Sequence, residues 1–242
     1  MLKGLQGKTV LVTGAAGNIG AEAVRRFVQE DCTVVASDIN AKALADLAAP
    51  LGDKVITIAG DVSKAADAAA AVAVADAAGG LDLAFINAGV ECLSAPVIDF
   101  SEAEYDRVFN VNVRGVFLTA QAVLRSFTAR NKKGNILITA SIAGLQGSPM
   151  TSIYNSSKFA AIGIARSLAL EVGSQGIRVN VLAPGAVKSR MMSALEESIG
   201  AASGVSADTI RTGIEAATGL GRYATPTEIA STAAWEIGRA HV

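Results

Sequence analysis

Residues 8–20 read KTVLVTGAAGNIG, and this stretch decides how the rest of the chain is arranged. The first six residues have the apolar, β-branched character of a short buried strand, and Gly14, Gly17 and Gly20 follow at once. The next residues, IGAEAVRRFVQE, show the apolar spacing of a helix. Glycines allow a pyrophosphate to approach the backbone, and a helix N-terminus offers free N–H groups and a positive dipole end. This order predicts a dinucleotide site, although tight packing of the strand against the helix would also require glycines.

Apolar strand-like runs alternate with helical patterns along the whole chain, and the links between them are short. Such alternation predicts one α/β domain with a parallel, doubly wound sheet, helices on both faces and right-handed crossovers. We place this single domain at residues 1–235. The strands expected after the first are TVVAS (33–37), KVITIA (54–59), LDLAFI (81–86), NILITA (135–140) and IRVNVLA (177–183).

Composition narrows the class of protein and its partners. Hydrophobic residues make up 51% of the 242 residues, and 24 glycines against 5 prolines suit an enzyme with many strand-to-helix turns. The net charge of −1 and the lack of a basic run argue against nucleic acid. Cys32 and Cys92 lack metal-ligand spacing, so we expect reduced thiols, no metal site and a cytoplasmic location. The apolar run 65–78 contains acidic residues, which predicts a surface helix and no membrane span, and residues 1–12 show no signal peptide.

A second informative stretch is SIAGLQGSPMTSIYNSSK, residues 141–158, which begins where the predicted fifth strand ends. Tyr154 and Lys158 are four residues apart, so they lie on one face of the helix expected there. A tyrosine with a pKa of about 10 is a poor base at neutral pH. An ammonium about 4 Å away would contribute roughly 4 kcal/mol, up to about 3 pKa units, before desolvation opposes it. Ser141 could hydrogen-bond a substrate oxygen whose charge changes during reaction. A chance Tyr–Lys pair is the alternative.

Asp38 directly follows the second predicted strand. A carboxylate at this position can accept hydrogen bonds from both hydroxyls of an adenine ribose and would repel a 2′-phosphate, so NAD is favoured over NADP. Ile39 and Asn40 come next, and no basic residue is adjacent. Alternatively, Asp38 caps a helix that begins near Ala41.

Asn112 lies among apolar residues within a helix expected over 102–130. A buried asparagine needs hydrogen-bond partners, so it either bonds the backbone for structural reasons or holds a water near Lys158 that would form a proton path. Small residues at 87–89 would let the adenosine side of a dinucleotide lie close to the backbone, although they also suit a plain turn.

From about Leu5 to Trp235, the chain resembles the short single-domain branch of the short-chain dehydrogenase/reductase family. Each motif that carries the resemblance is weak evidence alone, but together the motifs are highly specific for the family. They are TGAAGNIG (13–20), Asp38, Asp61-Val62, Asn87-Ala88-Gly89, Asn112, Ser141, YNSSK (154–158) and Pro184-Gly185. The resemblance implies a Rossmann-type NAD(P)-binding fold. It also implies an NAD-dependent oxidoreductase that transfers hydride between a secondary alcohol or ketone and the nicotinamide, and a homodimer or homotetramer.

The resemblance assigns a role to each candidate catalytic residue. Tyr154 is the general acid or base, Lys158 lowers its pKa and holds the nicotinamide ribose, and Ser141 positions the substrate oxygen. Asn112 would hold the relay water. The residues implied to line the cofactor are Gly14, Gly17, Asn18, Ile19, Gly20, Asp38, Ile39, Asp61, Val62, Asn87, Ala88, Gly89, Tyr154, Lys158, Pro184, Gly185, Val187 and Ser189.

The chain departs from the family pattern in several places. Asn18 stands where the family has glycine, and we expect the turn to survive because asparagine tolerates unusual backbone angles. Ser189 stands where the family often has threonine near the nicotinamide carboxamide, and its hydroxyl can act in the same way. The family's seventh strand is expected to be missing, which would leave the sixth strand as an exposed edge. Residues 190–221 are expected to form a mobile segment over the substrate, with apolar contacts from Met191, Met192 and Leu195.

The last residues are unusual. IGRAHV, residues 237–242, is the translation of ATC GGA AGA GCA CAC GTC, which matches a common sequencing-library adapter. We therefore expect residues 236–242 not to be native; a genuine variable tail is the alternative. His241, the single histidine, lies in this tail, so without the tail no Ser-His-Asp hydrolase can be built on Ser141.

Two further functional classes are compatible with the fold. A catalytically silent nucleotide-sensing or scaffold protein could use it, but the complete set of Asn112, Ser141, Tyr154 and Lys158 argues for an enzyme. A dehydratase or epimerase with bound NAD would need a larger substrate region than this chain offers. The substrate is not specified by the sequence; the expected pocket walls include Glu91, Cys92, Gln146 and Met191.

Overall fold

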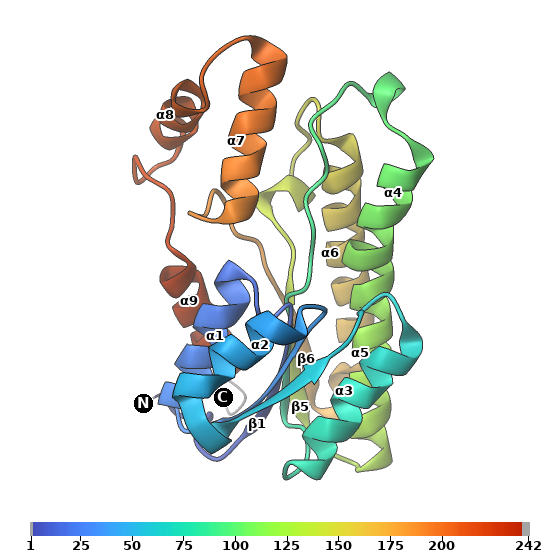
Figure 1. The fold of residues 1–242 in the computed structure, drawn as a ribbon. Helices are drawn as coiled ribbons and strands as arrows, with labels where there is room; N and C mark the ends of the chain where they lie inside the picture. Colours follow the sequence, from blue (N-terminus) through green and yellow to red (C-terminus); the bar gives the residue numbers. More distant parts are fainter. Residues whose placement is uncertain (1, 239–242) are drawn as a thin grey trace.

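A parallel sheet runs through the centre of the computed structural model, which describes residues 2–238 (Figure 1). Within these residues the sheet has six strands in the order β3-β2-β1-β4-β5-β6, and every neighbouring pair is parallel. The predicted doubly wound α/β fold is therefore confirmed. The strands are β1 (Thr9–Thr13), β2 (Thr33–Asp38), β3 (Val55–Ala59), β4 (Leu83–Ile86), β5 (Gly134–Thr139) and β6 (Ile177–Leu182).

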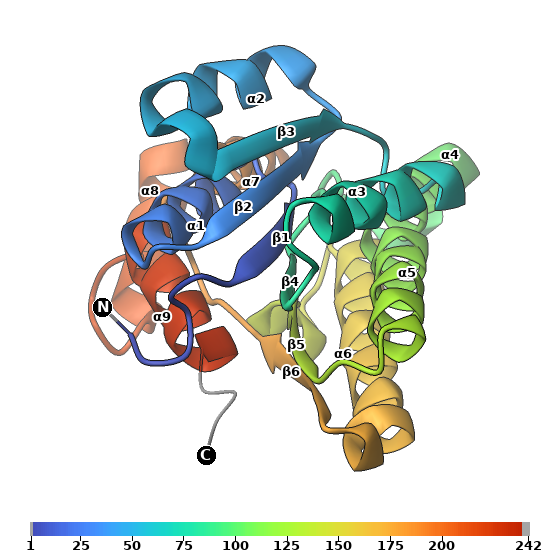
Figure 2. The ribbon, with the colours of Figure 1, turned by 90° about the horizontal axis from the view of Figure 1, so that it is seen from below.

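Helices cover both faces of the sheet, as Figure 2 shows. One face carries α1 (Asn18–Gln29), α2 (Ala41–Ala48) and α9 (Pro226–Gly238). The other carries α3 (Ala65–Ala77), α5 (Val116–Ala129) and α6 (Ser152–Val172). The remaining helices, α4 (Glu102–Phe109), α7 (Arg190–Ser203) and α8 (Ala207–Ala217), stand above the sheet in Figure 1.

Two hydrophobic cores lie on the two faces of the sheet. The alternation of side chains along β1 separates them, because Val10 and Val12 pack into the core beneath α1 while Leu11 packs into the core beneath α5. Phe85 fills the first core and Phe127 the second, and both side chains are fully buried. Strands buried on both faces read as continuous apolar runs, which is why the sequence pattern located them.

The helix expected over residues 102–130 is interrupted. It divides into α4, a π-helical segment (Asn110–Gly115) and α5. Ser101 caps its start by accepting a hydrogen bond from the Glu104 N–H at 3.2 Å. Residues that widen a helix in this way are frequent at functional sites, and here the wide segment carries Asn112.

The segment over residues 190–221, expected to be a mobile segment over the substrate, contains the two helices α7 and α8, which pack against each other. Ser189 caps α7 by accepting a hydrogen bond from the Met192 N–H at 3.2 Å. Glu196 of α7 is only 2% exposed and forms an ion pair with Arg211 of α8 at 3.1 Å. A buried carboxylate needs such a partner, so the pair holds the two helices together.

The expected non-native tail falls partly within α9. Glu236, Ile237 and Gly238 complete this helix, and the Ile237 carbonyl accepts a hydrogen bond from Asn135 Nδ2 at 2.6 Å. Residues 239–242, including His241, lie outside the described residues, so the nature of the tail stays a prediction. None of the helices in residues 2–238 combines the length and hydropathy that a membrane crossing requires.

Candidate active site

The glycine-rich turn between β1 and α1 is shaped by close contacts. Gly14 has a φ of +63°, and a Cβ there would lie 2.7 Å from the Ala88 Cα. A Cβ on Gly20 would lie 2.0 Å from the Gly14 carbonyl oxygen, so this glycine is required for packing. The packing explanation of these glycines is therefore confirmed, and their role in binding a dinucleotide stays a prediction.

Asn18 needs no unusual backbone angle, contrary to the expectation. It is the first residue of α1, while Gly17 occupies the N-cap position with an extended φ of −75° and ψ of 166°. The glycine that comes one residue early therefore provides the N-cap of α1, with an ordinary extended backbone. Asn18 Oδ1 accepts a hydrogen bond from the Arg190 N–H at 3.3 Å, which connects the turn to the first residue of α7.

Asp38 holds the glycine-rich turn from the end of β2. Its Oδ2 accepts a hydrogen bond from the Ala16 N–H and its Oδ1 one from the Asn40 N–H, both at 3.0 Å. The cap of α2 is Asn40, whose side chain accepts from the Ala43 N–H, so the alternative that Asp38 caps this helix is wrong. The carboxylate therefore stands beside the glycine-rich turn. Ile39 is 73% exposed next to it.

A narrow, closely packed hollow lies between the strand ends and α3, and Ser37, the residue before Asp38, lines it. Asp61, at its edge, accepts hydrogen bonds from the Ser63 hydroxyl at 2.7 Å and the Ser63 N–H at 2.9 Å, and these bonds hold the Asp61 pKa below its ordinary value. Thr119 was not identified from the sequence as a residue that lines this hollow. Its buried hydroxyl has no hydrogen-bond partner within residues 2–238, and its polar character in an apolar helix was the signal available in the sequence. The hollow is lined in part by Thr13, Ser37, Asp61, Val62 and Thr119.

Asn87 connects the ends of three strands. Its N–H donates to Thr13 Oγ1 at 3.0 Å, and its side-chain NH₂ donates to the Thr13 and Gly14 carbonyls at 3.4 Å. On the other side, Thr139 Oγ1 donates to Asn87 Oδ1 at 3.1 Å. The Ala88 N–H also reaches Thr13 Oγ1 at 3.2 Å. The residues at 87–89 therefore do more than form a plain turn, because they join the glycine-rich turn to β5.

Ser141 lies at the end of β5 with an extended backbone. Its Oγ accepts a hydrogen bond from the Ala143 N–H at 3.2 Å and lies 3.5 Å from the Pro184 carbonyl, to which it donates. The Ile142 N–H donates to the same carbonyl at 2.9 Å, so the chain after β6 fixes the end of β5. Beyond Pro184 and Gly185, Val187 is buried and pairs with Ala224 in an isolated bridge.

Lys158 is buried beneath the ring of Tyr154 on α6. Its Nζ lies 5.6 Å from the ring centroid and donates to the Thr139 carbonyl at 3.2 Å, and the residue is only 4% exposed. Burial lowers the pKa of Lys158 from 10.5 to about 8. Gly89 permits this arrangement, since a Cβ there would lie 3.2 Å from Lys158 Nζ and 3.3 Å from Asn112 Oδ1.

The pKa of Tyr154 is raised, where the sequence predicted a lowered value. Burial of the phenol raises the pKa most, the Ser141 hydroxyl beside it lowers the pKa, and Cys92 and Glu91 raise it further. The prediction assumed an ammonium about 4 Å from the phenol oxygen and treated desolvation as the smaller effect. In the structure Lys158 lies beneath the ring, and desolvation of the phenol is the largest effect.

Asn112 bonds the backbone, which was one of the two alternatives. Its side chain is fully buried; Oδ1 accepts from the Val90 N–H and Nδ2 donates to the Val90 carbonyl, both at 2.8 Å. Nδ2 also lies 3.1 Å from Ser157 Oγ. The wide segment between α4 and α5 thus holds the loop that follows β4 against α6. Asn112 Oδ1 and Lys158 Nζ both border Gly89, so the two groups share one small region.

Comparisons with known proteins agree with this geometry. Residues 8–200 match the family model described as short chain dehydrogenase. A 2,5-dichloro-2,5-cyclohexadiene-1,4-diol dehydrogenase from Sphingobium indicum is 34% identical over 96% of this chain and 90% of its own length. A sorbitol dehydrogenase from Cereibacter sphaeroides is 37% identical over 76% of this chain and 72% of its own. The crystal structure of a 3-ketoacyl-(acyl-carrier-protein) reductase from Brucella melitensis, complexed with NADH, superposes with a TM-score of 0.88 at 27% identity, covering 98% and 94% of the two chains.

The buried Lys158 predicts a pH-dependent effect on stability. Between its folded pKa of about 8 and the 10.5 of an exposed lysine, the unfolded chain binds the extra proton, so the free energy of unfolding rises with pH in this window. Lys158→Met removes the cost of burying a charge, and we expect it to raise the free energy of unfolding near pH 6.5 by up to about 3 kcal/mol. The gain should shrink steadily as the pH rises from 8 towards 10.5.

Urea unfolding of both proteins at several pH values measures this difference. Lys42→Met, which replaces an exposed lysine on α2, serves as the control and should show no such gain at low pH. A Lys158→Met difference that does not change with pH would contradict the assigned burial of charge.

Proposed function

The chain belongs to the short-chain dehydrogenase family and is an oxidoreductase with an NAD(P)-binding Rossmann fold, and we propose that Tyr154 is its general acid and base. In this proposal a secondary alcohol or the matching ketone is the substrate. The nicotinamide, when bound, accepts or gives up the hydride. In this proposal Ser141 and Tyr154 bind the reacting oxygen and Tyr154 moves its proton, while the Lys158 ammonium lies beneath the Tyr154 ring.

The single observation that supports this role best is that a hydroxyl group and an ammonium group both lie close to the Tyr154 phenol. The Ser141 hydroxyl lies beside Tyr154, and the Lys158 ammonium is buried beneath the same ring. A protein that only senses or carries a nucleotide has no need to bury a lysine in this position, because burying a charge costs free energy. The grouping therefore favours an enzyme over a silent scaffold.

The pKa directions assign a protonation state to each reaction direction. Because the Tyr154 pKa is raised, the phenol carries its proton at neutral pH, which is the form that ketone reduction requires. Alcohol oxidation requires the phenolate, so its rate should rise with pH. Ser141, held by the Ala143 N–H and the Pro184 carbonyl, keeps its hydroxyl beside the phenol, where it can share the substrate oxygen.

The Tyr154→Phe variant tests the proposal directly. Loss of the proton-transferring group should lower kcat/KM for a secondary alcohol by about 100- to 10,000-fold while NAD binding is retained. Nicotinamide absorbance measures turnover, and quenching of protein fluorescence measures binding. Tyr105→Phe, an exposed tyrosine on α4, is the matched control and should leave kcat/KM unchanged. Turnover that persists in Tyr154→Phe would overturn the assignment.

We also propose that the enzyme prefers NAD to NADP. The support is the Asp38 carboxylate, which stands at the turn between β1 and α1 and accepts the Ala16 N–H. A negative charge at this place repels the 2′-phosphate that distinguishes NADP. The exposed neighbour Ile39 supplies no positive charge to balance it.

Replacement of Asp38 by Asn should weaken this preference. The amide oxygen can still accept the Ala16 N–H, but the repelling charge is gone, so the ratio of kcat/KM for NADP to that for NAD should rise by about tenfold. Steady-state kinetics with both dinucleotides measures the ratio. Asp46→Asn on α2, where the side chain is exposed, is the control. An unchanged ratio in Asp38→Asn would show that selectivity has another source.

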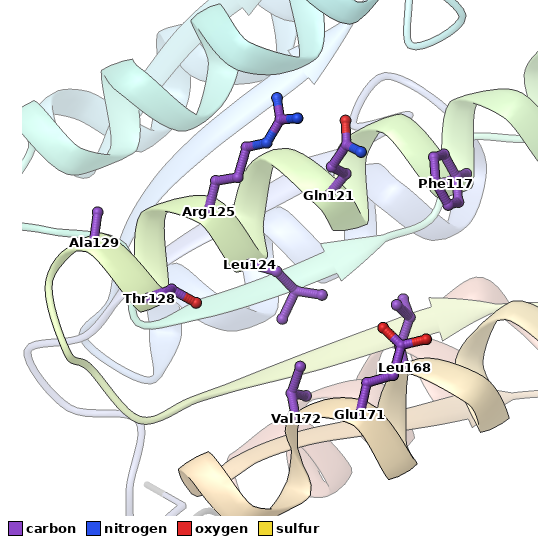
Figure 3. A pocket seen from close by; sticks show the side chains of 9 residues that line it. All are labelled: Phe117, Gln121, Leu124, Arg125, Thr128, Ala129, Leu168, Glu171 and Val172. Carbon is purple, nitrogen blue, oxygen red and sulfur yellow. The ribbon is translucent and has the colours of Figure 1, made fainter.

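We propose further that the chain forms a homo-oligomer through α5 and α6. These helices border an outward-facing hollow of about 530 Å³, lined from α5 by side chains that include Phe117 and Leu124 and from α6 by Leu168 and Val172 (Figure 3). Phe117 is 46% exposed at one end of it. The two walls also carry opposite charges, since Arg125 lies on α5 and Glu171 on α6. A second copy related by a twofold axis would therefore place complementary charges against them.

Phe117→Asp should disrupt such an assembly, because a carboxylate would be buried in an apolar contact. Sedimentation velocity of the wild-type protein should give a dimer or a larger species, and the variant should sediment at a lower mass. Ile98→Asp replaces an apolar side chain that is 87% exposed elsewhere and is the control. A monomeric wild-type protein would refute the proposed interface, as would a variant that sediments at the wild-type mass.

The two cysteines fit the cytoplasmic location that we propose. Cys32 and Cys92 are both free and buried. Burial raises the pKa of the Cys32 thiol to about 12, and its Sγ donates to the Leu5 carbonyl at 3.2 Å. Such thiols behave as small apolar side chains and are stable in a reducing compartment.

A further inference from the structure

The loop that follows β4 is fixed in place at three successive points. Asn112 bonds both the N–H and the carbonyl of Val90 at 2.8 Å. Arg107 Nη2 donates to the Glu91 carbonyl at 2.6 Å, and the Leu93 N–H donates to Glu104 Oε1 at 2.9 Å. The backbone around Glu91 is therefore held firmly, which is the condition for a side chain to act as a selective contact.

This loop packs beside the Tyr154 phenol. Cys92, the residue after Glu91, is only 4% exposed and shares a small apolar cluster with Val108, Ile153 and the half-buried Tyr154. The groups that act electrostatically on the phenol from this side are Cys92 and Glu91, and the Glu91 charge raises the Tyr154 pKa. Glu91 is thus within electrostatic reach of the reacting oxygen.

Within residues 2–238 the Glu91 carboxylate forms no hydrogen bond or ion pair. The nearby Arg107 guanidinium attracts it electrostatically, but donates its hydrogen bonds to Glu104 at 2.9 Å and to the Glu91 carbonyl. The segment after β5 that also leads to Tyr154, residues 141–151, contains no charged side chain. A half-buried carboxylate that forms no direct hydrogen bond, on a loop fixed at three points, is therefore available to a ligand.

We propose that Glu91 is a specificity-determining residue that accepts a hydrogen bond from a second hydroxyl group of the substrate. The inference rests on the proposed function, in which Tyr154 handles the reacting hydroxyl. It makes neutral diols and polyols the preferred substrates and disfavours substrates that carry a negative charge near the reacting carbon. A carboxylate forms strong charge-assisted bonds with hydroxyl groups and repels anions at short range.

Three probe alcohols separate these effects: 1,2-cyclohexanediol, cyclohexanol and 3-hydroxybutyrate, each oxidised with NAD. Glu91→Leu removes both the acceptor and the charge, so kcat/KM for the diol should fall by about tenfold or more while that for cyclohexanol changes by less than about twofold. Glu91→Gln removes only the charge, so kcat/KM for 3-hydroxybutyrate should rise by about tenfold. Glu102→Gln, the same change at an exposed position on α4, is the control and should change none of these values.

The pH profile supplies a readout that a structural role would not change. The groups acting on the phenol are Ser141, Cys92 and Glu91, with Lys158 beneath the ring on the same helix. Removing the Glu91 charge lowers the Tyr154 pKa, so the acid limb of alcohol oxidation should move to lower pH in Glu91→Gln. It should stay in place in Glu102→Gln.

The outcomes distinguish the two proposals. If the wild-type protein oxidises none of the probes with either dinucleotide, the proposed function fails and this inference fails with it. If the wild-type protein oxidises them but Glu91→Leu keeps the wild-type ratio of diol to cyclohexanol, the inference about Glu91 is overturned while the proposed function stands. Should Glu91→Leu fail to fold, an unchanged selectivity and pH profile in Glu91→Gln would still refute it.

Discussion

The side-chain amide of Asn87 is the interaction on which the rest of the site depends. It stands at the end of the central strand β4 and bonds the end of β1 on one side and Thr139 of β5 on the other. The Thr139 carbonyl in turn accepts the Lys158 ammonium. The glycine-rich turn and the helix that carries the phenol are therefore connected through one amide and one threonine. Neighbouring parallel strands bring their carboxyl ends together, and these bonds convert that proximity into a defined geometry.

The sequence was sufficient to locate the strands of the sheet and the polar residues of the candidate site that lie at the ends of these strands. Buried parallel strands are apolar over their whole length, so their ends are visible as the first polar residue after each run. Asp38, Asn87 and Ser141 were located in this way, and the structure places each at or just beyond the end of its strand. Helical spacing alone predicted that Tyr154 and Lys158 share one face of α6, but not that the ammonium lies beneath the ring.

Other features depend on contacts between distant segments and had no local signal. The polar Asn112 was visible in the sequence, but the π-helical geometry of residues 110–115 and the bonds of Asn112 to the loop after β4 were not. The helices of the 190–221 segment are stabilised by the buried pair of Glu196 with Arg211, fifteen residues apart in sequence. The raised pKa of Tyr154 results from desolvation, which depends on the packing of the whole cleft.

The bonds between Asn112 and Val90 change how a variant at position 112 has to be interpreted. The same asparagine borders the Lys158 ammonium and anchors the main chain that leads to Glu91. Its replacement would therefore disturb the surroundings of the Lys158 ammonium and the loop together, through a side chain that is fully buried. A low turnover rate in an Asn112 variant would therefore not prove that a relay water had been lost. Mutagenesis at this position reports on the anchoring of the loop as much as on the chemistry.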